Sequence, residues 1–345
     1  MPIPGTRVRI FVHLSIILLL PIALTACGAG GPEADMADYL ARLKRTLETT
    51  APDNSPAPIK APPRSGEIQL AIQPGNLDAL DFLALRGCAV QATVGKRNSS
   101  LGRMAAPSQQ LLLDLEYLRL APDCIVSLRE RGESSLATTL QVAYALKREQ
   151  LPASIFNATL GGPEYRQLWR ANRAASSYPQ QTSSAVTSAL QQVASLGARW
   201  LDGQYAADNR AFEIALGEIA GGDGGELLQA LALQQSWLSR ADSVVRQRTN
   251  TDPLCEPGRM SGQAEILQTV VRKFFIGKIQ PWSADLARRY HELVPPIAEL
   301  EELLQDVLPA TYSEWQDRRD RQLQTMMTAP RDHVTALQAL LEPCQ

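Results

Sequence analysis

Hydrophobic side chains recur every three or four positions along most of this 345-residue chain. The first case is the segment 33–48, where Met36, Leu40, Leu43 and Leu47 are separated by charged and polar residues. This spacing places the apolar side chains on one face of an amphipathic helix. We expect that face to dock on the main body of the protein. The alternative is a loose helix that lies on a lipid surface.

The same spacing recurs in later segments, each of which predicts a further helix. These segments are Leu111–Leu118, Leu136–Tyr144, Val186–Trp200, Phe212–Ile219, Leu227–Val245, Leu267–Phe275 and Val334–Leu341. One short stretch, 67–72, instead alternates apolar and polar residues through Ile68, Leu70 and Ile72, and predicts a single strand. With so few strand signals and no fixed-period repeat, we predict an all-α fold, an irregular multi-helix domain.

Three local signals punctuate this helical pattern. The stretch "APDNSPAPIKAPPRS" at 51–65 is too rich in proline for a helix, and indicates an extended linker or a strap wrapped on the body. The stretch "GGDGG" at 221–225 lacks the pattern of a phosphate-binding loop and indicates a flexible turn between helices. Thr311 and Glu314 have the spacing of a capping box, which predicts a helix start there.

The first residues of the chain indicate export. Arg7 and Arg9 precede an apolar stretch of about 15 residues, 10–24, which is shorter than the ~20 residues that a membrane-spanning helix needs. Small residues follow at Thr25 and Ala26, as in a cleaved signal peptide. The alternative is a buried or membrane-spanning N-terminal helix.

The last four residues of this region, Leu-Thr-Ala-Cys, resemble the lipobox of bacterial lipoproteins. That resemblance implies cleavage before Cys27 and attachment of diacylglycerol and an amide-linked acyl chain, such as palmitate, to that residue. Two or more acyl chains hold a protein stably on a membrane. In bacteria with two membranes, Gly28 in place of aspartate implies sorting to the outer membrane. We therefore expect a signal peptide at 1–26, a lipid tether with helix and linker at 27–66, and a helical periplasmic domain at 67–345.

Composition agrees with a folded, exported protein. Hydrophobic residues make up 45% of the chain, enough for a core, and the net charge of -2 gives no reason to expect a nucleic-acid partner. Without Cys27 four cysteines remain, an even number that indicates two disulfides in an oxidising compartment. Three pairings are possible. We favour the local pairs Cys88–Cys124 and Cys255–Cys344, because they minimise crossing between regions.

Candidate chemistry is sparse. The most unusual polar stretch is "KRNSSLGRM" at 96–104, in which Arg97, Asn98, Ser99, Ser100 and Arg103 form a possible binding loop for an anion. The alternative is structural, with Asn98, Ser99 and Ser100 capping helix ends.

No catalytic residue, metal site or cofactor is predicted from motifs. The serines lack a G-x-S-x-G or S-x-x-K setting. After removal of the signal only His291 and His333 remain, both on helical segments where a histidine is usually at the surface. They lack the H-x-x-x-H spacing of a zinc site, and the cysteines lack C-x-x-C spacing.

Together with the lipobox, the stretches "DYLARLKRTL", "LDFLALRGC" and "RNSSLG" resemble a family of uncharacterised lipoproteins defined by a domain of unknown function. The resemblance implies an envelope lipoprotein and brings no catalytic residues. Our leading hypothesis is an outer-membrane-anchored, periplasm-facing, non-enzymatic interaction or assembly module with an envelope protein partner. The alternatives are a small-ligand or lipid-binding module with a groove between helices, and a cell-wall glycan hydrolase that uses two carboxylates.

Overall fold

The computed structural model describes residues 30–52, 60–73, 79–171, 178–179 and 182–344. It confirms the all-α prediction, since these residues contain helices and no strand. The chain divides into the units Met1–Gly30 and Gly31–Gln345, and every element below belongs to the second unit. The predicted signal peptide and Cys27 fall outside the described residues.

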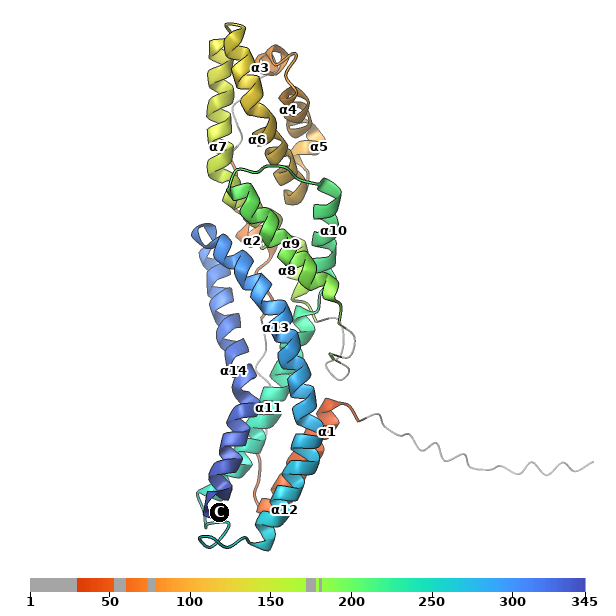
Figure 1. Cartoon of the computed structure of the whole chain (residues 1–345), viewed down its shortest axis with the longest axis vertical. Coiled ribbons are helices and arrows are strands. Elements are labelled where there is room, and N and C mark those ends of the chain that lie inside the picture. Colours follow the sequence, from red (N-terminus) through yellow and green to blue (C-terminus); the bar gives the residue numbers. More distant parts are fainter. Residues whose placement is uncertain (1–29, 53–59, 74–78, 172–177, 180–181, 345) are drawn as a thin grey trace, which may run out of the picture. The chain divides into compact units, whose positions relative to one another are not determined.

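Figure 1 shows the helices coloured in chain order, from red to blue. The first half contains α1 (Pro32–Leu47), α2 (Ser65–Ile68), α3 (Ala79–Ala84), α4 (Val90–Asn98), α5 (Ser100–Arg103), α6 (Pro107–Glu130), α7 (Ser134–Ala158) and α8 (Pro163–Leu168). The second half contains α9 (Ser184–Leu201), α10 (Asn209–Ala220), α11 (Gly224–Thr249), α12 (Gly262–Val270), the π-helix η2 (Val271–Ile279), α13 (Gln280–Leu303), the 3₁₀-helix η3 (Gln305–Val307), α14 (Ala310–Leu341) and the 3₁₀-helix η4 (Glu342–Cys344).

Several helices begin at a side-chain cap that satisfies a free backbone N–H group. Asp208 accepts from the backbone N–H of Ala211 at 2.9 Å before α10, and Ser261 accepts from that of Ala264 at 3.1 Å before α12. The predicted capping box at Thr311 is wrong. Helix α14 begins at Ala310 without a side-chain cap, because Pro309 in an extended conformation already sets the turn.

The predicted strand at 67–72 is also wrong. Ile68 ends the short helix α2, and the residues after it are extended but pair with a side chain. The backbone N–H of Leu70 donates to Asn157 Oδ1 at 2.8 Å, and Asn157 Nδ2 donates to the Leu70 carbonyl at 2.8 Å. The Asn157 amide thus forms the pair of backbone hydrogen bonds that a neighbouring strand would form. The alternating pattern predicts an extended segment correctly, but not a strand, because no second strand among the described residues pairs with it.

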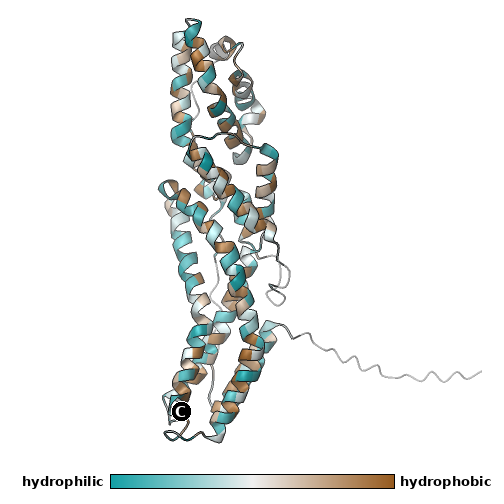
Figure 2. Cartoon of the chain, in the orientation of Figure 1, coloured by the Kyte–Doolittle hydropathy of each residue, from teal (hydrophilic) through white to brown (hydrophobic). Residues whose placement is uncertain are grey.

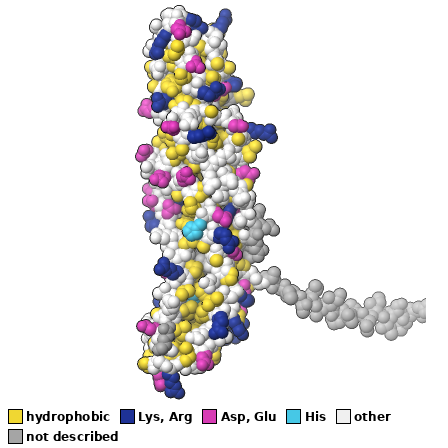
Figure 3. Space-filling model, viewed as in Figure 1, with side chains coloured by type: hydrophobic (Ala, Val, Ile, Leu, Met, Phe, Trp, Pro, Cys, Tyr) yellow, Lys and Arg dark blue, Asp and Glu magenta, His cyan; other side chains and the backbone are white. Residues whose placement is uncertain are grey.

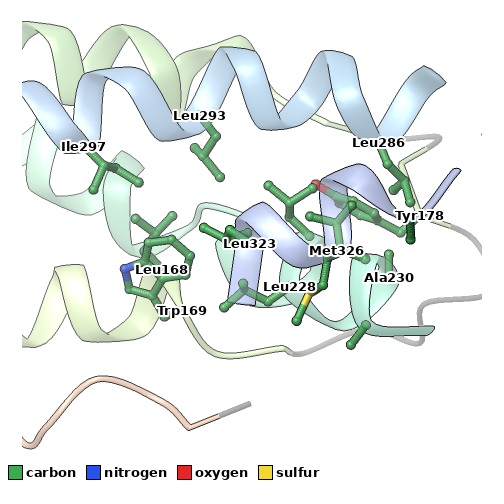
Figure 4. Close-up of a cluster of buried hydrophobic side chains, with 14 of the residues drawn as sticks. Leu168, Trp169, Tyr178, Leu228, Ala230, Leu286, Leu293, Ile297, Leu323 and Met326 are labelled. Atoms are coloured by element: carbon green, nitrogen blue, oxygen red, sulfur yellow. The ribbon is translucent and has the colours of Figure 1, made fainter. Parts of the chain in front are cut away.

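Apolar faces of the helices meet in two hydrophobic clusters. Figure 2 shows hydrophobic residues in brown and hydrophilic residues in teal, mixed along the helices. The smaller cluster lies among α4, α6 and α7. The larger one includes α1 and α8 to α14, and Figure 4 shows part of it, where side chains of α8, α11, α13 and α14 meet. On the face drawn in Figure 3, acidic and basic side chains are interspersed with apolar ones.

The predicted disulfide pairing is confirmed. Cys88 bonds Cys124 with 5.4 Å between Cα atoms, and Cys255 bonds Cys344 with 5.0 Å. The first bridge joins the residues before α4 to α6. The second ties the end of the chain to the loop before α12, where the Gly258 N–H also donates to the Pro343 carbonyl at 3.2 Å. On the chain-entropy model each bridge contributes about 4 kcal/mol.

The first helix docks on the body, as predicted. Helix α1 packs against α11, α12 and η2, and its five largest apolar side chains are at most 4% exposed. At its edge Lys278 Nζ lies 2.7 Å from Asp35 Oδ1, and the Arg42 guanidinium stacks 3.9 Å from the centre of the Phe274 ring. Helix α1 is therefore an integral part of the folded unit.

The described ends of the proline-rich stretch lie against the same body. Trp315 Nε1 donates to the Lys60 carbonyl at 3.0 Å, and Arg240 Nε donates to the Pro52 carbonyl at 3.2 Å. These contacts favour the strap over the free linker. None of the described helices has the length and hydrophobicity needed to cross a membrane.

The predicted turn between helices is present, since residues 221–223 connect α10 to α11, but the stretch 221–225 is also a site of close packing. A Cβ atom at Gly225 would lie 2.3 Å from the carbonyl carbon of Arg170, and one at Gly222 would lie 2.4 Å from Leu168 Cδ1. Gly224 and Gly225 form the first turn of α11. Gly222 and Gly225 are required because the start of α11 lies against Leu168 and Arg170, where no side chain fits.

Candidate functional site

The predicted binding loop is divided between two helices. Arg97 and Asn98 end α4, whereas Ser100 and Arg103 belong to the single turn of α5. Ser99 joins them: its Oγ accepts from the Gly102 N–H at 3.0 Å and donates to the Lys96 carbonyl at 2.7 Å. This is the capping role that the structural alternative assigned to Ser99.

A small cavity lies beside this segment, between α4, α6 and α7, and we call it the α4–α6–α7 cavity. Its volume is about 120 Å³. Three residues of the predicted loop line it, and Ser99 and Ser100 do not. The lining residues are Gln73, Thr93, Val94, Arg97, Asn98, Arg103, Leu113, Asp114, Tyr117, Ala143 and Lys147.

Helical spacing brings these side chains to one place. Thr93 and Arg97 are four residues apart on α4, and so are Ala143 and Lys147 on α7, so that each pair shares a helix face. The Cys88–Cys124 bridge fixes the start of α4 to α6 on the opposite wall. A disulfide therefore holds together two of the helices, α4 and α6, that bound the cavity.

The charged groups in the cavity form one cluster. Asp114, whose side chain is 7% exposed, accepts a hydrogen bond from Lys147 Nζ. Arg97 Nε lies 3.6 Å from the same carboxylate oxygen, and Arg97 Nη2 donates to Gln110 Oε1 at 3.2 Å. The exposed Arg103 adds a third cation, and its side chain has no hydrogen bond or ion pair to another described residue. The cavity thus carries one acidic and three basic side chains.

Two polar atoms at this cavity lack hydrogen-bond partners. Thr93 is 1% exposed, and its Oγ1 atom has none; the same holds for Arg97 Nε. Tyr117, by contrast, donates to the Leu140 carbonyl at 3.2 Å, and burial raises the pKa of its phenol. Tyr117 consequently remains protonated at neutral pH and cannot serve as a base.

Sequence reasoning missed Thr93, Asp114 and Lys147. One signal was available for Asp114, because it interrupts the apolar stripe Leu111–Leu118 and therefore faces a helix or a cavity. Thr93 and Lys147 carry no comparable signal, since a lone threonine or lysine on a helix is usually solvated.

A second polar cluster joins three helices that are distant in sequence. The expectation that His333 is a surface residue is wrong, because it is 0% exposed. Its Nε2 lies 2.7 Å from Tyr39 Oη, and its Nδ1 lies 2.5 Å from Asp242 Oδ1. Burial and the Asp242 carboxylate raise the pKa of Tyr39. The cluster is closed to solvent, so it fastens α1 to α11 and α14.

A third cluster is built around a buried ion pair. Arg319 donates from Nη1 to Glu301 Oε1 at 2.7 Å and from Nη2 to Oε2 at 2.8 Å, and both side chains are at most 2% exposed. Tyr312 donates to Glu301 Oε1 at 2.6 Å, and Tyr165 at 3.1 Å. Because both oxygens of the buried Glu301 carboxylate have partners, this cluster is a structural joint between α8, α13 and α14.

Three further surface cavities are lined by described residues. They lie at Pro253–Gly262, around Tyr144 and Tyr205, and between α1 and α12. Each has one carboxylate in its wall, Glu256, Glu149 or Glu48, where the glycan-hydrolase alternative needs two. Among the residues that the structure describes, no group of three His, Cys, Asp or Glu side chains is placed to hold a metal ion.

Comparison with known proteins gives a family but no activity. Residues 36–345 match the model of a family described as protein of unknown function, DUF3080. Neither the curated proteins nor the solved structures gave a match.

Proposed function

This chain belongs to the DUF3080 family, whose function is unknown, and we propose that it is a lipid-anchored envelope protein. On this proposal Cys27 carries the acyl chains, and the helical body faces the periplasm from the outer membrane. The body acts without catalysis, as an interaction or assembly module that binds an envelope protein.

The docking of α1 is the observation that carries this proposal. Helix α1 starts at Pro32, close after Cys27 in the chain, and it is packed into the core from Met36 onward. The chain from Cys27 to Pro32, about five residue steps, spans at most about 18 Å when extended. An acylated Cys27 would therefore hold a rigid body close to the membrane surface, and membrane attachment would place any partner-binding face at a defined height.

Two further features support the proposal. Both disulfides fit an oxidising compartment such as the periplasm. Leu101 in α5 and Met104 directly after it are 85% and 87% exposed, although their segment is held by the Ser99 cap. Large apolar side chains held in solvent are suited to contact with a protein partner.

The anchor is tested by metabolic labelling of the full chain with an alkyne fatty acid, followed by membrane fractionation. We expect the native chain to carry the label in outer-membrane fractions. Cys27→Ser should lose label and membrane attachment together. Gly28→Asp is the matched control, which should keep the label but move to inner-membrane fractions. A labelled Cys27→Ser chain, or an unmodified Met1 in mass spectra, would contradict the proposal.

The interaction role is tested by a photo-crosslinking amino acid at Leu101 in living cells. A protein partner on this face predicts one dominant adduct. The same substitution at Ile276 on η2, which is 50% exposed, should give none. Equal adducts from both positions, or none from Leu101, would count against a partner on this face.

A further inference from the structure

We propose that the α4–α6–α7 cavity binds a small organic carboxylate, a compound with one anionic end and a short apolar end. This goes beyond the anchoring and interaction role, which would stand without it. Nothing in the family match assigns a ligand to these residues.

The charge of the cavity selects an anion. Asp114 neutralises one cation through its hydrogen bond with Lys147, and Arg97 and Arg103 leave an excess of positive charge in the walls. Arg97 Nε lies 3.6 Å from Asp114, which is beyond hydrogen-bond distance. A carboxylate that enters the cavity would give this N–H an acceptor, and planar guanidinium groups suit carboxylates well.

Thr93 is the strongest sign that a ligand belongs here. Thr93 lines the cavity, and its buried hydroxyl has no partner, although buried hydroxyl groups are normally hydrogen-bonded. Because Thr93 and Arg97 share one face of α4, a single carboxylate could accept from the Thr93 hydroxyl and from Arg97 together. The Asn98 amide at the end of α4 lines the same cavity.

The size and the remaining walls of the cavity restrict the apolar end of the ligand. A cavity of about 150 Å³ holds a benzene molecule, so the 120 Å³ here fits a ligand of roughly six non-hydrogen atoms. Val94, Leu113 and Ala143 supply apolar walls. A short-chain monocarboxylate fits both limits, whereas a dianion such as phosphate would leave the apolar walls unused.

The test is calorimetry on the full chain in detergent, with butyrate as the probe. Butyramide is the neutral control of the same shape, and inorganic phosphate is the anion without an apolar end. We expect saturable butyrate binding with a Kd on the order of 1 mM, and at least about tenfold weaker binding of butyramide and phosphate. Arg97→Gln and Thr93→Val should each weaken butyrate binding about fivefold to tenfold. Arg119→Gln, on the exposed face of α6, should leave it unchanged.

Four results would overturn the proposal. They are no saturation by butyrate, equal binding of butyramide, tighter binding of phosphate than of butyrate, and unchanged butyrate binding by both cavity variants. Thr93→Val removes no hydrogen bond in the structure, so the variant protein should fold normally. This variant can therefore test the proposal even if Arg97→Gln does not fold. None of these results depends on the lipid anchor, so this inference and the proposed function can fail separately.

Discussion

The substitution Glu301→Gln tests whether the buried ion pair with Arg319 is a structural joint. Glutamine keeps nearly the same shape and can still accept from Tyr312, but it removes the charge that faces the guanidinium. Arg319 would then be a cation with 2% exposure, held between the rings of Trp169 and Trp315.

The expected cost depends on the surroundings of Arg319. Removing the charge of one partner of a buried ion pair typically lowers the free energy of unfolding by about 3–5 kcal/mol. Asp320 keeps a 2.8 Å contact with the guanidinium, and its side chain is half exposed, so we expect the lower end, about 3 kcal/mol. A unit of about 300 residues has an unfolding entropy near 0.6 kcal/mol per K, so the midpoint should fall by about 5 °C.

The assay is thermal unfolding by circular dichroism, with Glu302→Gln as control, because Glu302 is the exposed neighbour of Glu301. The control should change the midpoint by less than about 1 °C. Adding Arg319→Met to Glu301→Gln should recover part of the loss, since no unpaired charge remains buried. The reasoning is refuted if Glu301→Gln behaves like the control, or if the two substitutions are simply additive.

Three further predictions test packing, the cavity and pH. Gly225→Ala should destabilise the protein by about 2 kcal/mol or more, because the new Cβ atom would overlap the backbone of Arg170. Gly217→Ala should instead stabilise the protein by up to about 1 kcal/mol, because a Cβ atom at this helix position meets open space. Urea unfolding of the two variants measures both changes. Without ligand, Thr93→Val should raise the melting midpoint by about 1–2 °C, because it removes an unpartnered buried hydroxyl, and a lower midpoint would contradict this. Burial raises the pKa of several tyrosines above the usual value of about 10, so the folded state keeps protons that the unfolded state releases. Stability should therefore fall as pH rises above about 10, by up to about 1.4 kcal/mol per pH unit for each buried tyrosine. Tyrosinate absorbance should rise in two steps, first for the exposed rings and then, with unfolding, for the buried ones, whereas one smooth step would contradict the prediction.

The sequence determined the helical architecture because helix formation depends on local spacing. The segments in which apolar residues recur every three or four positions became helices, and α7, for example, contains the predicted segment Leu136–Tyr144. The disulfide pairing was also accessible, since local pairs cross the fewest regions. The alternating pattern at 67–72 failed because a strand needs a partner strand, and only the fold reveals that Asn157 replaces one.

The sequence predicted only some of the residues that line the α4–α6–α7 cavity. The polar stretch pointed to Arg97, Asn98 and Arg103, but it also included Ser99, whose hydroxyl is used by the cap. Asp114 and Lys147 come from two other helices and meet Arg97 only after α4, α6 and α7 have packed together.

Only the tertiary structure decided which polar residues are buried. His333 and Tyr39 are 294 positions apart in the chain, yet their side chains share a hydrogen bond inside the core. The sequence likewise indicates a turn at 221–225, but only the fold reveals that Gly222 and Gly225 are packed against Leu168 and Arg170. Spacing reports which residues share a helix face. It does not report which other helix will cover that face, because that helix can be distant in the chain. Whether a polar group on the face is buried depends on this covering helix.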